Sequence, residues 1–425
     1  MEIPELYELY QAHPDIATDS RKIKAGNLFF ALKGPHFNGN LFTIQALAAG
    51  AAYAVVDEYE GPENSQIILV SDTLSCLQKL AKFHRQKFQI PVIAVTGSNG
   101  KTTTKELVHE VLSTTYKTYT TGGNLNNHIG IPLTILKIRK DAEMAVIEMG
   151  ANHLNEIASY CEYTLPTHGI ITNCGKAHLD GFGGEEGVRK GKGELFDHLK
   201  RSNGMAFVMK DYPFLLEMAQ GIPEIMTYGT EGADITGEVK NCAGLLEIAI
   251  TKGAGIKGIS TQMVGEYNLP NIMAAVAVGK YFNVEEDKIK SALENYIPSN
   301  SRSQLIQQGA NKIILDAYNA NPSSMKAAIE NFAKMEGEDK VLMLGGMMEL
   351  GNKSMIEHAA IIDLIGEYQW KAVILVGRDF NQSKHPYLYF DTAEGAKEWL
   401  KEQQYTNTQI LVKGSRTFQM ERVLD

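Results

Sequence analysis

A short glycine turn with a lysine and a hydroxyl group is the feature of this chain that most clearly predicts chemistry. Residues 96–104 read Thr-Gly-Ser-Asn-Gly-Lys-Thr-Thr-Thr, between an apolar run at 92–95 and a helical pattern. Such a turn surrounds a phosphate with backbone N–H groups, while Lys101 reaches the terminal phosphates and Thr102 can bind Mg²⁺. The common phosphate-loop spacing has a further glycine where this chain has Val95. The shorter pattern still predicts nucleotide binding, with a simple helix cap as the alternative.

Three further side chains could serve a nucleotide site. Glu148 directly follows the apolar strand 145–147, where α/β nucleotide sites place a Mg²⁺ ligand, although an acidic helix cap also fits. His178 follows another predicted strand, and on its own it reads as an ordinary loop histidine because Mg²⁺ prefers oxygen ligands. Lys192 lies in the basic run 189–194, which is typical of a solvent-exposed helix face.

Polar turns also follow predicted strands elsewhere. Asn124–Asn127 fits ordinary turn chemistry before an apolar segment. The string Asp316-Ala-Tyr-Asn-Ala-Asn-Pro322 could frame a nucleotide or a small zwitterion, or could form only a tight loop. Lys413-Gly-Ser-Arg416 offers donors to a carboxylate or phosphate. Its alternative is an ordinary strand-to-helix turn.

The bulk composition limits the class of protein. A chain of 425 residues with 44% hydrophobic and 21% charged residues predicts a globular protein of two to four domains. The net charge of −9 argues against a nucleic-acid groove. No apolar run approaches the roughly 20 residues that span a bilayer, and the N-terminus shows no secretory signal. Four widely spaced cysteines suit a reducing cytoplasm and argue against disulfides or a zinc site.

The elements that must position these residues alternate between strand and helix, which predicts mostly parallel sheets covered by helices. Residues 232–260 differ and predict short antiparallel strands on the same domain. A boundary near residues 88–90 and a linker at 298–301 divide the chain. The expected fold is α/β in three domains, with a central P-loop-type, mostly parallel sheet between a small N-terminal α/β domain and a C-terminal Rossmann-like domain. Their predicted bounds are residues 1–88, 89–298 and 299–425.

The order of these motifs along nearly the whole chain resembles the Mur ligases, the ATP-dependent amide-forming enzymes of peptidoglycan precursor synthesis. The string Tyr318–Pro322 is the most discriminating, being characteristic of the branch that adds D-alanyl-D-alanine; the diaminopimelate-adding branch carries Asp-Asn-Pro-Arg instead. The other matching segments are Thr18–Arg21 with Gly26, Leu28-Phe29 and Ala31–Gly34; Gly97–Thr103; Asn124–Pro132; Glu148–Gly150; Thr172-Asn173 with Ala177–Leu179; Lys192–Glu194; Asn268 and Asn271; Arg302; Glu349–Gly351; and Lys413–Ser415.

The resemblance implies that ATP phosphorylates the carboxylate of a UDP-N-acetylmuramoyl-tripeptide and that D-alanyl-D-alanine attacks the acyl phosphate. It implies that Lys192 is carbamylated into a carboxylate-like ligand and that His178 serves a second metal site. The expected cofactors are ATP and Mg²⁺, and the expected protein is a cytoplasmic monomer that acts on small molecules, without nucleic-acid or membrane partners. The implied catalytic residues are Lys101, Lys192, His178 and Glu148; the ATP-binding residues are Gly97, Ser98, Asn99, Gly100, Lys101, Thr102, Thr103, Asn268, Asn271, Arg302 and Asp316; the substrate-binding residues are Asp19, Ser20, Arg21, Asn126, Asn127, Tyr318, Asn319, Asn321, Lys413 and Ser415; and the metal ligands are Thr102, Glu148, His178 and Lys192.

Three departures from the family pattern stand out. Tyr267 replaces the usual histidine before the two asparagines, Met347 replaces a frequent aspartate, and Asn38-Gly39-Asn40 replaces Asp-Gly-His. Another short-P-loop ligase, such as folylpolyglutamate synthase, is the nearest alternative, although the segment around Asp19-Ser20-Arg21 argues against it. A nucleotide-binding regulatory protein that has lost catalysis is a second alternative.

Overall fold

The computed structural model describes all 425 residues, which form alternating helices and strands. The chain is therefore of the expected α/β class. None of its helices combines the length and the apolar character needed to cross a bilayer. The chain divides into two compact units, the first comprising residues 1–94, 116–150 and 155–168, and the second comprising residues 95–115, 151–154 and 169–425.

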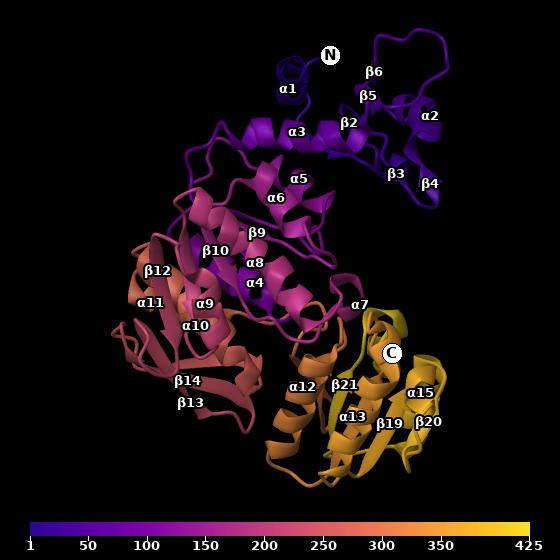
Figure 1. Cartoon of the computed structure of the whole chain (residues 1–425). Helices are drawn as coiled ribbons and strands as arrows, with labels where there is room; N and C mark the ends of the chain where they lie inside the picture. Colours follow the sequence, from indigo (N-terminus) through magenta and orange to yellow (C-terminus); the bar gives the residue numbers. More distant parts are fainter. The chain divides into compact units, whose positions relative to one another are not determined.

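A small parallel sheet organises the N-terminal part of the first unit, with the strand order β1-β2-β5-β6 (Figure 1). Phe29 and Val56 are buried in its core. Helix α3 begins at Thr73, where the Asp72 carboxylate accepts a hydrogen bond from the backbone N–H of Ser75 at 2.6 Å and caps the helix. The elements are β1 (Ile16–Ala17), β2 (Leu28–Phe30), β3 (Lys33–Gly34), β4 (Phe37–Asn38), α2 (Thr43–Ala48), β5 (Tyr53–Val56), β6 (Ile67–Leu69) and α3 (Thr73–Arg85), with 3₁₀ turns at Ser20–Lys22 and Gly39–Phe42.

Helices α1, α5 and α6 of the first unit pack on α3. The imidazole of His84 is buried, with Nδ1 3.0 Å from the Tyr7 hydroxyl and Nε2 2.9 Å from the carbonyl oxygen of Ile138. Burial lowers the pKa of His84 to about 4, so the ring is neutral near pH 7. The remaining elements are α1 (Ile3–Ala12), β8 (Thr118–Thr120), α5 (Gly130–Ile135), β9 (Met144–Glu148) and α6 (Glu156–Thr164).

Nine strands form the largest sheet, in the order β15-β14-β13-β12-β11-β10-β7-β9-β8. The strands β7 and β11 are buried along their whole length, as in parallel sheets covered on both faces. The predicted antiparallel segment is confirmed, since β13, β14 and β15 pair antiparallel in this same sheet. The elements are β7 (Val92–Thr96), α4 (Lys101–Ser113), β10 (His168–Ile171), α7 (Leu179–Phe182), α8 (Glu185–Arg201), β11 (Met205–Met209), α9 (Pro213–Ala219), β12 (Glu224–Gly229), β13 (Ile235–Asn241), β14 (Leu245–Lys252), β15 (Ile259–Val264), a 3₁₀ turn (Glu266–Asn268), α10 (Leu269–Tyr281) and α11 (Glu286–Asn295).

The C-terminal part of the second unit holds a six-stranded sheet in the order β16-β17-β21-β18-β19-β20 (Figure 1). Only β16 pairs antiparallel, and the chain alternates strand and helix as expected for a doubly wound unit. The elements are β16 (Gln304–Gln308), β17 (Asn311–Asp316), α12 (Pro322–Lys334), β18 (Lys340–Gly345), α13 (Ser354–Gly366), β19 (Ala372–Val376), α14 (Arg378–Asn381), β20 (Leu388–Phe390), α15 (Ala393–Gln403) and β21 (Gln409–Lys413), with 3₁₀ turns at Gly351–Lys353, Arg416–Phe418 and Met420–Leu424.

Candidate functional site

The phosphate loop joins β7 to α4, and its two glycines are required by geometry. Gly97 has a φ of +144° and Gly100 a φ of +78°, a backbone region that glycine adopts at little cost. A Cβ atom on Gly97 would lie 2.0 Å from Oγ1 of Thr172, and one on Gly100 would lie 2.5 Å from Oδ1 of Asn271. The loop therefore has no room for a side chain at either position.

The segment after β10 holds this loop in place. The hydroxyl of Thr172 donates to the carbonyl oxygen of Asn99 at 2.5 Å, and the backbone N–H of Asn99 donates to Oδ1 of Asn173 at 3.0 Å. The hydroxyl of Ser98 donates to the carbonyl oxygen of Gly175 at 3.0 Å. The Thr172-Asn173 motif thus supports the loop from the next strand end.

Lys101 lies at the first position of α4, with its ammonium directly over the loop. Its Nζ is 2.8 Å from the carbonyl oxygen of Gly97 and 3.2 Å from that of Ser98. The hydroxyl of Thr104 donates to Oδ1 of Asn271 at 3.0 Å, and the amide of Asn271 donates to Asn268 at 2.9 Å. The structure therefore brings both predicted asparagines to the start of α4, whose N-terminal dipole attracts anions.

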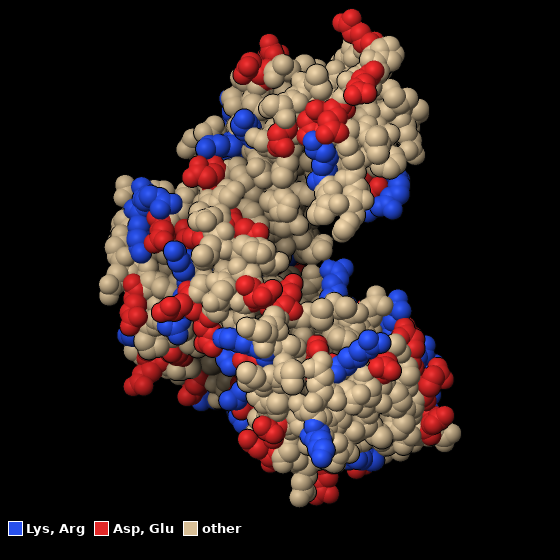
Figure 2. Space-filling model, turned by 45° about the vertical axis from the view of Figure 1, so that its right-hand side comes forward, with Lys and Arg blue, Asp and Glu red and all other residues tan.

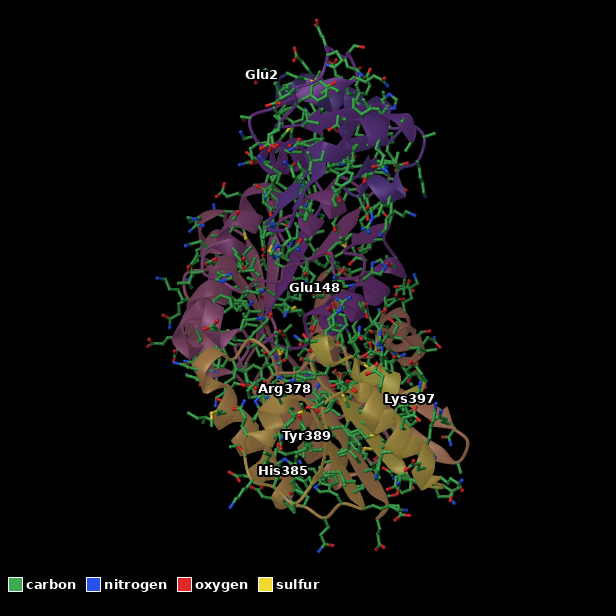
Figure 3. All side chains as sticks on the ribbon, turned by 90° about the vertical axis from the view of Figure 1, so that its right-hand side faces the viewer. Glu2, Glu148, Arg378, His385, Tyr389 and Lys397 are labelled. Atoms are coloured by element: carbon green, nitrogen blue, oxygen red, sulfur yellow. The ribbon has the colours of Figure 1, made fainter.

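Glu148, labelled in Figure 3, ends β9 in the first unit and is almost fully buried. Its Oε1 accepts a hydrogen bond from the amide of Asn126 at 2.7 Å, and its backbone N–H donates to the Thr121 hydroxyl at 3.0 Å. Its other carboxylate oxygen is buried without a hydrogen-bond partner. Glu148 does not cap a helix, because it lies inside the strand, and the helix-cap alternative is wrong.

Lys192 is fully buried in α8, so the interpretation of its run as an exposed basic face is wrong at this position. Its Nζ donates to the carbonyl oxygen of Ala151 at 2.9 Å and lies 4.9 Å from the centre of the Phe182 ring. A buried lysine is rare unless its charge is compensated or chemically altered.

His178 lies at the start of α7 with a φ of +52°. Its Nδ1 contacts the carboxylate of Glu349, which belongs to the loop after β18. The contact with His178, and to a lesser extent the charge of Lys101, hold the pKa of the Glu349 carboxyl below its usual range. Glu349 was part of a recognised motif but received no predicted role. Its place after a strand could have indicated one.

Asp316 and Lys413 form an ion pair at the carboxyl ends of the neighbouring strands β17 and β21, with Nζ 2.5 Å from Oδ2. Lys413 is 2% exposed, and its charge is thus balanced within the protein. The backbone N–H of Ser303 donates to the other carboxylate oxygen of Asp316 at 3.1 Å, and the Ser303 hydroxyl lies 3.1 Å from that of Tyr267.

Two arginines flank the ring of Tyr318. The guanidinium of Arg302 lies 3.5 Å from the ring centre and that of Arg416 lies 5.6 Å from it. The hydroxyl of Ser415 is buried without a hydrogen-bond partner. These groups give the site donors and positive charge for a carboxylate or phosphate. Arg416 was not among the predicted site residues.

Asn321 connects the predicted substrate loop to the phosphate loop. Its Oδ1 accepts from the backbone N–H of Ser324 at 2.9 Å and caps α12, while its Nδ2 donates to Oδ1 of Asn99 at 2.7 Å. Lys176 lies close by, with its backbone N–H 3.1 Å from the Ser323 hydroxyl and its Nζ 2.7 Å from Glu357. The tight-loop alternative for Asp316–Pro322 therefore does not account for all its contacts.

The predicted uridine-site residues lie in the first unit. Arg21 pairs with Asp19 at 2.8 Å, and its hydrogen bonds lower the pKa of Asp19 to about 2. Ser20 begins the 3₁₀ turn that Asp19 caps. The side chain of Asn127 accepts from the backbone N–H of Gly130 at 2.9 Å, which is the turn chemistry that was the alternative for it.

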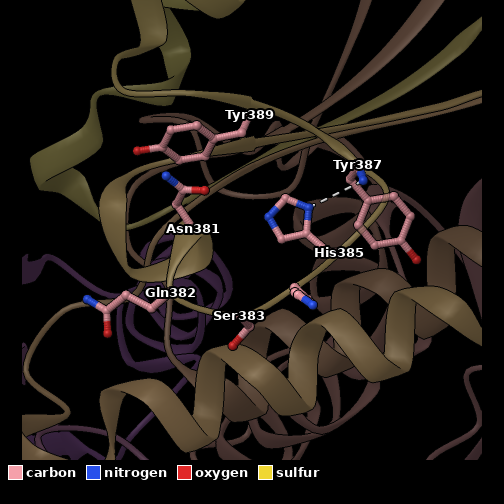
Figure 4. A pocket seen from close by; sticks show the side chains of 7 residues that line it. Asn381, Gln382, Ser383, His385, Tyr387 and Tyr389 are labelled. Carbon is pink, nitrogen blue, oxygen red and sulfur yellow. Dashed lines mark hydrogen bonds between the residues drawn. The ribbon is translucent and has the colours of Figure 1, made fainter.

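The surface also has features that do not involve the predicted site residues. A hollow of about 620 Å³ in the C-terminal part is lined by polar and aromatic side chains from Asn381 to Tyr389 (Figure 4), none of them a predicted site residue. Figure 2 shows acidic and basic side chains interspersed over the visible face. No group of three or more His, Cys, Asp or Glu side chains could hold a metal ion.

Three family models match consecutive parts of the chain. They are described as "Mur ligase family, catalytic domain" over residues 15–85, "Mur ligase middle domain" over residues 95–279 and "Mur ligase, glutamate ligase domain" over residues 301–416. Among curated proteins, the UDP-N-acetylmuramoyl-tripeptide–D-alanyl-D-alanine ligase of Bacillus subtilis (strain 168) is 37% identical, over 96% of this chain and 92% of that protein.

Solved structures give the same result. A crystal structure of MurF from Acinetobacter baumannii matches with a TM-score of 0.88 and 32% identity, over 98% of this chain and 97% of that one. The MurF ligase from Thermotoga maritima, solved in complex with ADP, matches with a TM-score of 0.88 and 27% identity, over 96% of each chain.

Proposed function

This chain belongs to the Mur ligase family, and from that premise we propose that it joins D-alanyl-D-alanine to a UDP-N-acetylmuramoyl-tripeptide in an ATP-dependent, ADP-forming reaction. The product is the UDP-N-acetylmuramoyl-pentapeptide of peptidoglycan synthesis. One observation carries the proposal: Asn321, in the string typical of the dipeptide-adding branch, donates to Asn99 of the phosphate loop at 2.7 Å. The two parts that must meet in this reaction are thus in contact.

We also propose the three-domain division at residues 1–88, 89–298 and 299–425. The family models at 15–85, 95–279 and 301–416 support it. The first of these matches covers the segment around Asp19-Ser20-Arg21, which argues against the alternative of folylpolyglutamate synthase.

The reaction needs charge neutralisation during phosphoryl transfer from ATP to the tripeptide carboxylate. Lys101 and the backbone N–H groups of Gly97–Thr103 bind the β- and γ-phosphates, where they stabilise the developing charge. The amino group of D-alanyl-D-alanine then attacks the acyl phosphate, and the tetrahedral intermediate collapses to an amide and free phosphate. Nucleotide contacts from Asn268, Asn271, Arg302 and Asp316 complete the ATP site.

Two of the proposed metal ligands carry oxygen donors of the kind that Mg²⁺ prefers. The buried carboxylate oxygen of Glu148 that lacks a hydrogen-bond partner is a ready anionic donor, and the Thr102 hydroxyl lies at the start of α4. Thr102 and Glu148 would hold one Mg²⁺, while His178 and Lys192, the latter as its carbamate, would serve a second site. When bound, Mg²⁺ neutralises charge on the transferring phosphoryl group.

The proposed contacts to the two substrates come from different segments of the chain. Asp19, Ser20, Arg21, Asn126 and Asn127 contact the UDP-linked tripeptide. The dipeptide lies against residues after β17 and β21, where Arg302 and Arg416 around Tyr318 suit its free carboxylate. Its remaining contacts are Asn319, Asn321, Lys413 and Ser415.

A phosphate-release assay tests the proposed function. Release should require ATP, a UDP-N-acetylmuramoyl-tripeptide and D-alanyl-D-alanine together, with ADP and the pentapeptide as products. Glutamate-dependent release with a folate in place of the tripeptide would contradict it. A comparison of lysine-containing and diaminopimelate-containing tripeptides identifies the third residue.

Replacing the loop lysine separates catalysis from uridine-nucleotide binding. Lys101→Ala should lower kcat at least 1,000-fold, since it removes the main cation on the transferring phosphate. Binding of the UDP-tripeptide, measured by calorimetry, should change less than threefold because its proposed contacts lie elsewhere. Equal loss of both would show that the domain assignment is wrong.

A further inference from the structure

The contact between His178 and Glu349 joins a segment with a proposed metal-binding residue to a loop that has no proposed role in the reaction. His178 belongs to the group proposed for metal binding, whereas Glu349 comes from the loop after β18 in the C-terminal part of the second unit. The charge of Glu349 also interacts with Lys101 of the phosphate loop. The Glu349 carboxylate thus contacts a residue of the proposed reaction centre.

The loop that carries Glu349 is held rigidly. The backbone N–H of Met347 donates to Nε2 of the fully buried His358 at 3.0 Å, and Nδ1 of that ring is 2.8 Å from the carbonyl oxygen of Ser354. Gly351 has a φ of +56°, and a Cβ there would lie 2.6 Å from Oδ1 of Asp180. The loop is therefore fitted closely against α7, the helix that begins after His178.

Glu349 itself has a φ of +63°. A residue with a side chain in this region is strained by about 1 kcal/mol and keeps the conformation only where its surroundings enforce it. Here the conformation directs the carboxylate at the imidazole. Leu350, the next residue, is buried.

We propose that Glu349 is a positioning residue that sets the tautomer and orientation of His178. A carboxylate on Nδ1 keeps the proton on that nitrogen and leaves the lone pair of Nε2 available as a ligand. Loss of a partner of this kind commonly changes the metal affinity of a histidine site 10–100-fold. The proposal rests on the proposed function for the metal-binding role of His178.

A nearby ion pair offers a matched control. Lys176 pairs with Glu357 at 2.7 Å, and this contact joins the same two parts of the chain without involving His178. If Glu349 only fastened one segment to the other, Glu349→Ala and Glu357→Ala would have similar effects. A positioning role predicts different effects on the imidazole and on metal affinity.

The experiment uses the full chain with ¹⁵N-labelled histidine, and His178→Gln identifies the His178 signal. The wild type should show a proton on Nδ1 of His178, and Glu349→Ala should move it to Nε2, while Glu357→Ala leaves it in place. An unchanged tautomer in Glu349→Ala overturns the proposal. This measurement needs no metal and no substrate.

A second measurement titrates Mn²⁺ into each protein in the presence of ADP, followed by electron paramagnetic resonance. Glu349→Ala should weaken Mn²⁺ binding at least tenfold, and Glu357→Ala less than threefold. Equal weakening by both variants also overturns the proposal. Failure of the wild type to form the amide would instead contradict the proposed function, and the tautomer result would stand apart from it.

Discussion

At the scale of single residues, the phosphate loop depends on two positions where any side chain would collide. Gly97 combines a left-handed φ with a neighbour at 2.0 Å from the position of a Cβ atom, and Gly100 combines the same features with Asn271. At both positions, the backbone conformation and the lack of space for a side chain require glycine.

The variant Gly97→Ala should therefore displace Thr172 or distort the loop. The expected result is a rise of at least 30-fold in the KM for ATP and a loss of about 1–3 kcal/mol in the free energy of unfolding. Kinetics and urea unfolding measure the two effects. Gly244→Ala is the control, because nothing lies within 4 Å of a Cβ there; a similar response in both variants would sink the argument.

His84 predicts how stability depends on pH. Its pKa is lowered to about 4 by burial, whereas the unfolded chain has a pKa near 6.5. The contribution of the neutral ring is complete above pH 6.5 and is lost as the pH falls toward 4, by up to about 3 kcal/mol. Urea unfolding at pH 7.5 and pH 5 should show a smaller loss for His84→Gln than for the wild type. Equal losses would contradict this assignment.

At the scale of elements, strand ends explain what could be predicted. Lys101, Glu148, Asp316 and Lys413 each follow or end an apolar run that reads as a strand, and the structure confirms those strands. Because carboxyl ends of neighbouring parallel strands share one edge of a sheet, Asp316 and Lys413 lie close enough to form an ion pair. Most of the fold could therefore be predicted from short apolar runs and from the turn residues that follow them.

Contacts between distant segments could not be predicted in this way. The burial of Lys192 depends on Ala151 and Phe182, and a basic run of charged residues gives no sign of it. Glu349 reaches His178 only because His358 and Asp180 shape its loop. The residue pattern within one helix or strand does not show which surface of another element that helix or strand contacts.

The side chain of Asn321 caps α12 and also donates to Asn99, and substitutions can separate these two roles. Asn321→Asp keeps the cap on α12, since both residues cap helices equally well, but it replaces the amide donor to Asn99 with a negative charge. We expect the melting temperature to stay within about 2 °C and kcat/KM for ATP to fall about tenfold. Asn321→Ala should lose about 1 kcal/mol of stability as well. A normal kcat/KM in Asn321→Asp would show that the contact with Asn99 is dispensable.

At the scale of the whole molecule, a series of hydrogen bonds connects the proposed middle domain with the proposed C-terminal domain next to the linker. It runs from Tyr267 to Ser303, then to Asp316 and Lys413. Two linker residues, Asn300 and Ser301, and Ser303 just after the linker have positive φ angles between 48° and 57°. The linker therefore has a defined conformation, which Tyr267 helps to hold in place of the more usual histidine.

The variant Tyr267→Phe removes only the Tyr267 hydroxyl from this series of hydrogen bonds. Burial raises the pKa of Tyr267, so the group that is lost is a neutral hydrogen-bonding one, worth about 1 kcal/mol. We expect the KM for ATP to rise about fivefold with little change in kcat, because Ser303 and Asp316 adjoin the proposed nucleotide site. Steady-state kinetics of Tyr267→Phe, with Tyr267→His as a comparison, measures this KM. An unchanged KM in Tyr267→Phe would show that this series of hydrogen bonds has no role in ATP binding.

The contact between Asn99 and Asn321 also affects how the protein is made. The two residues are 222 positions apart, so a ribosome that adds roughly 5–20 residues per second needs about 10–45 s to extend the chain from one to the other. During that time the glycine turn exists without one of its polar neighbours. The nascent chain can therefore complete the polar contacts of its phosphate loop only after residue 321 of its 425 residues has been added.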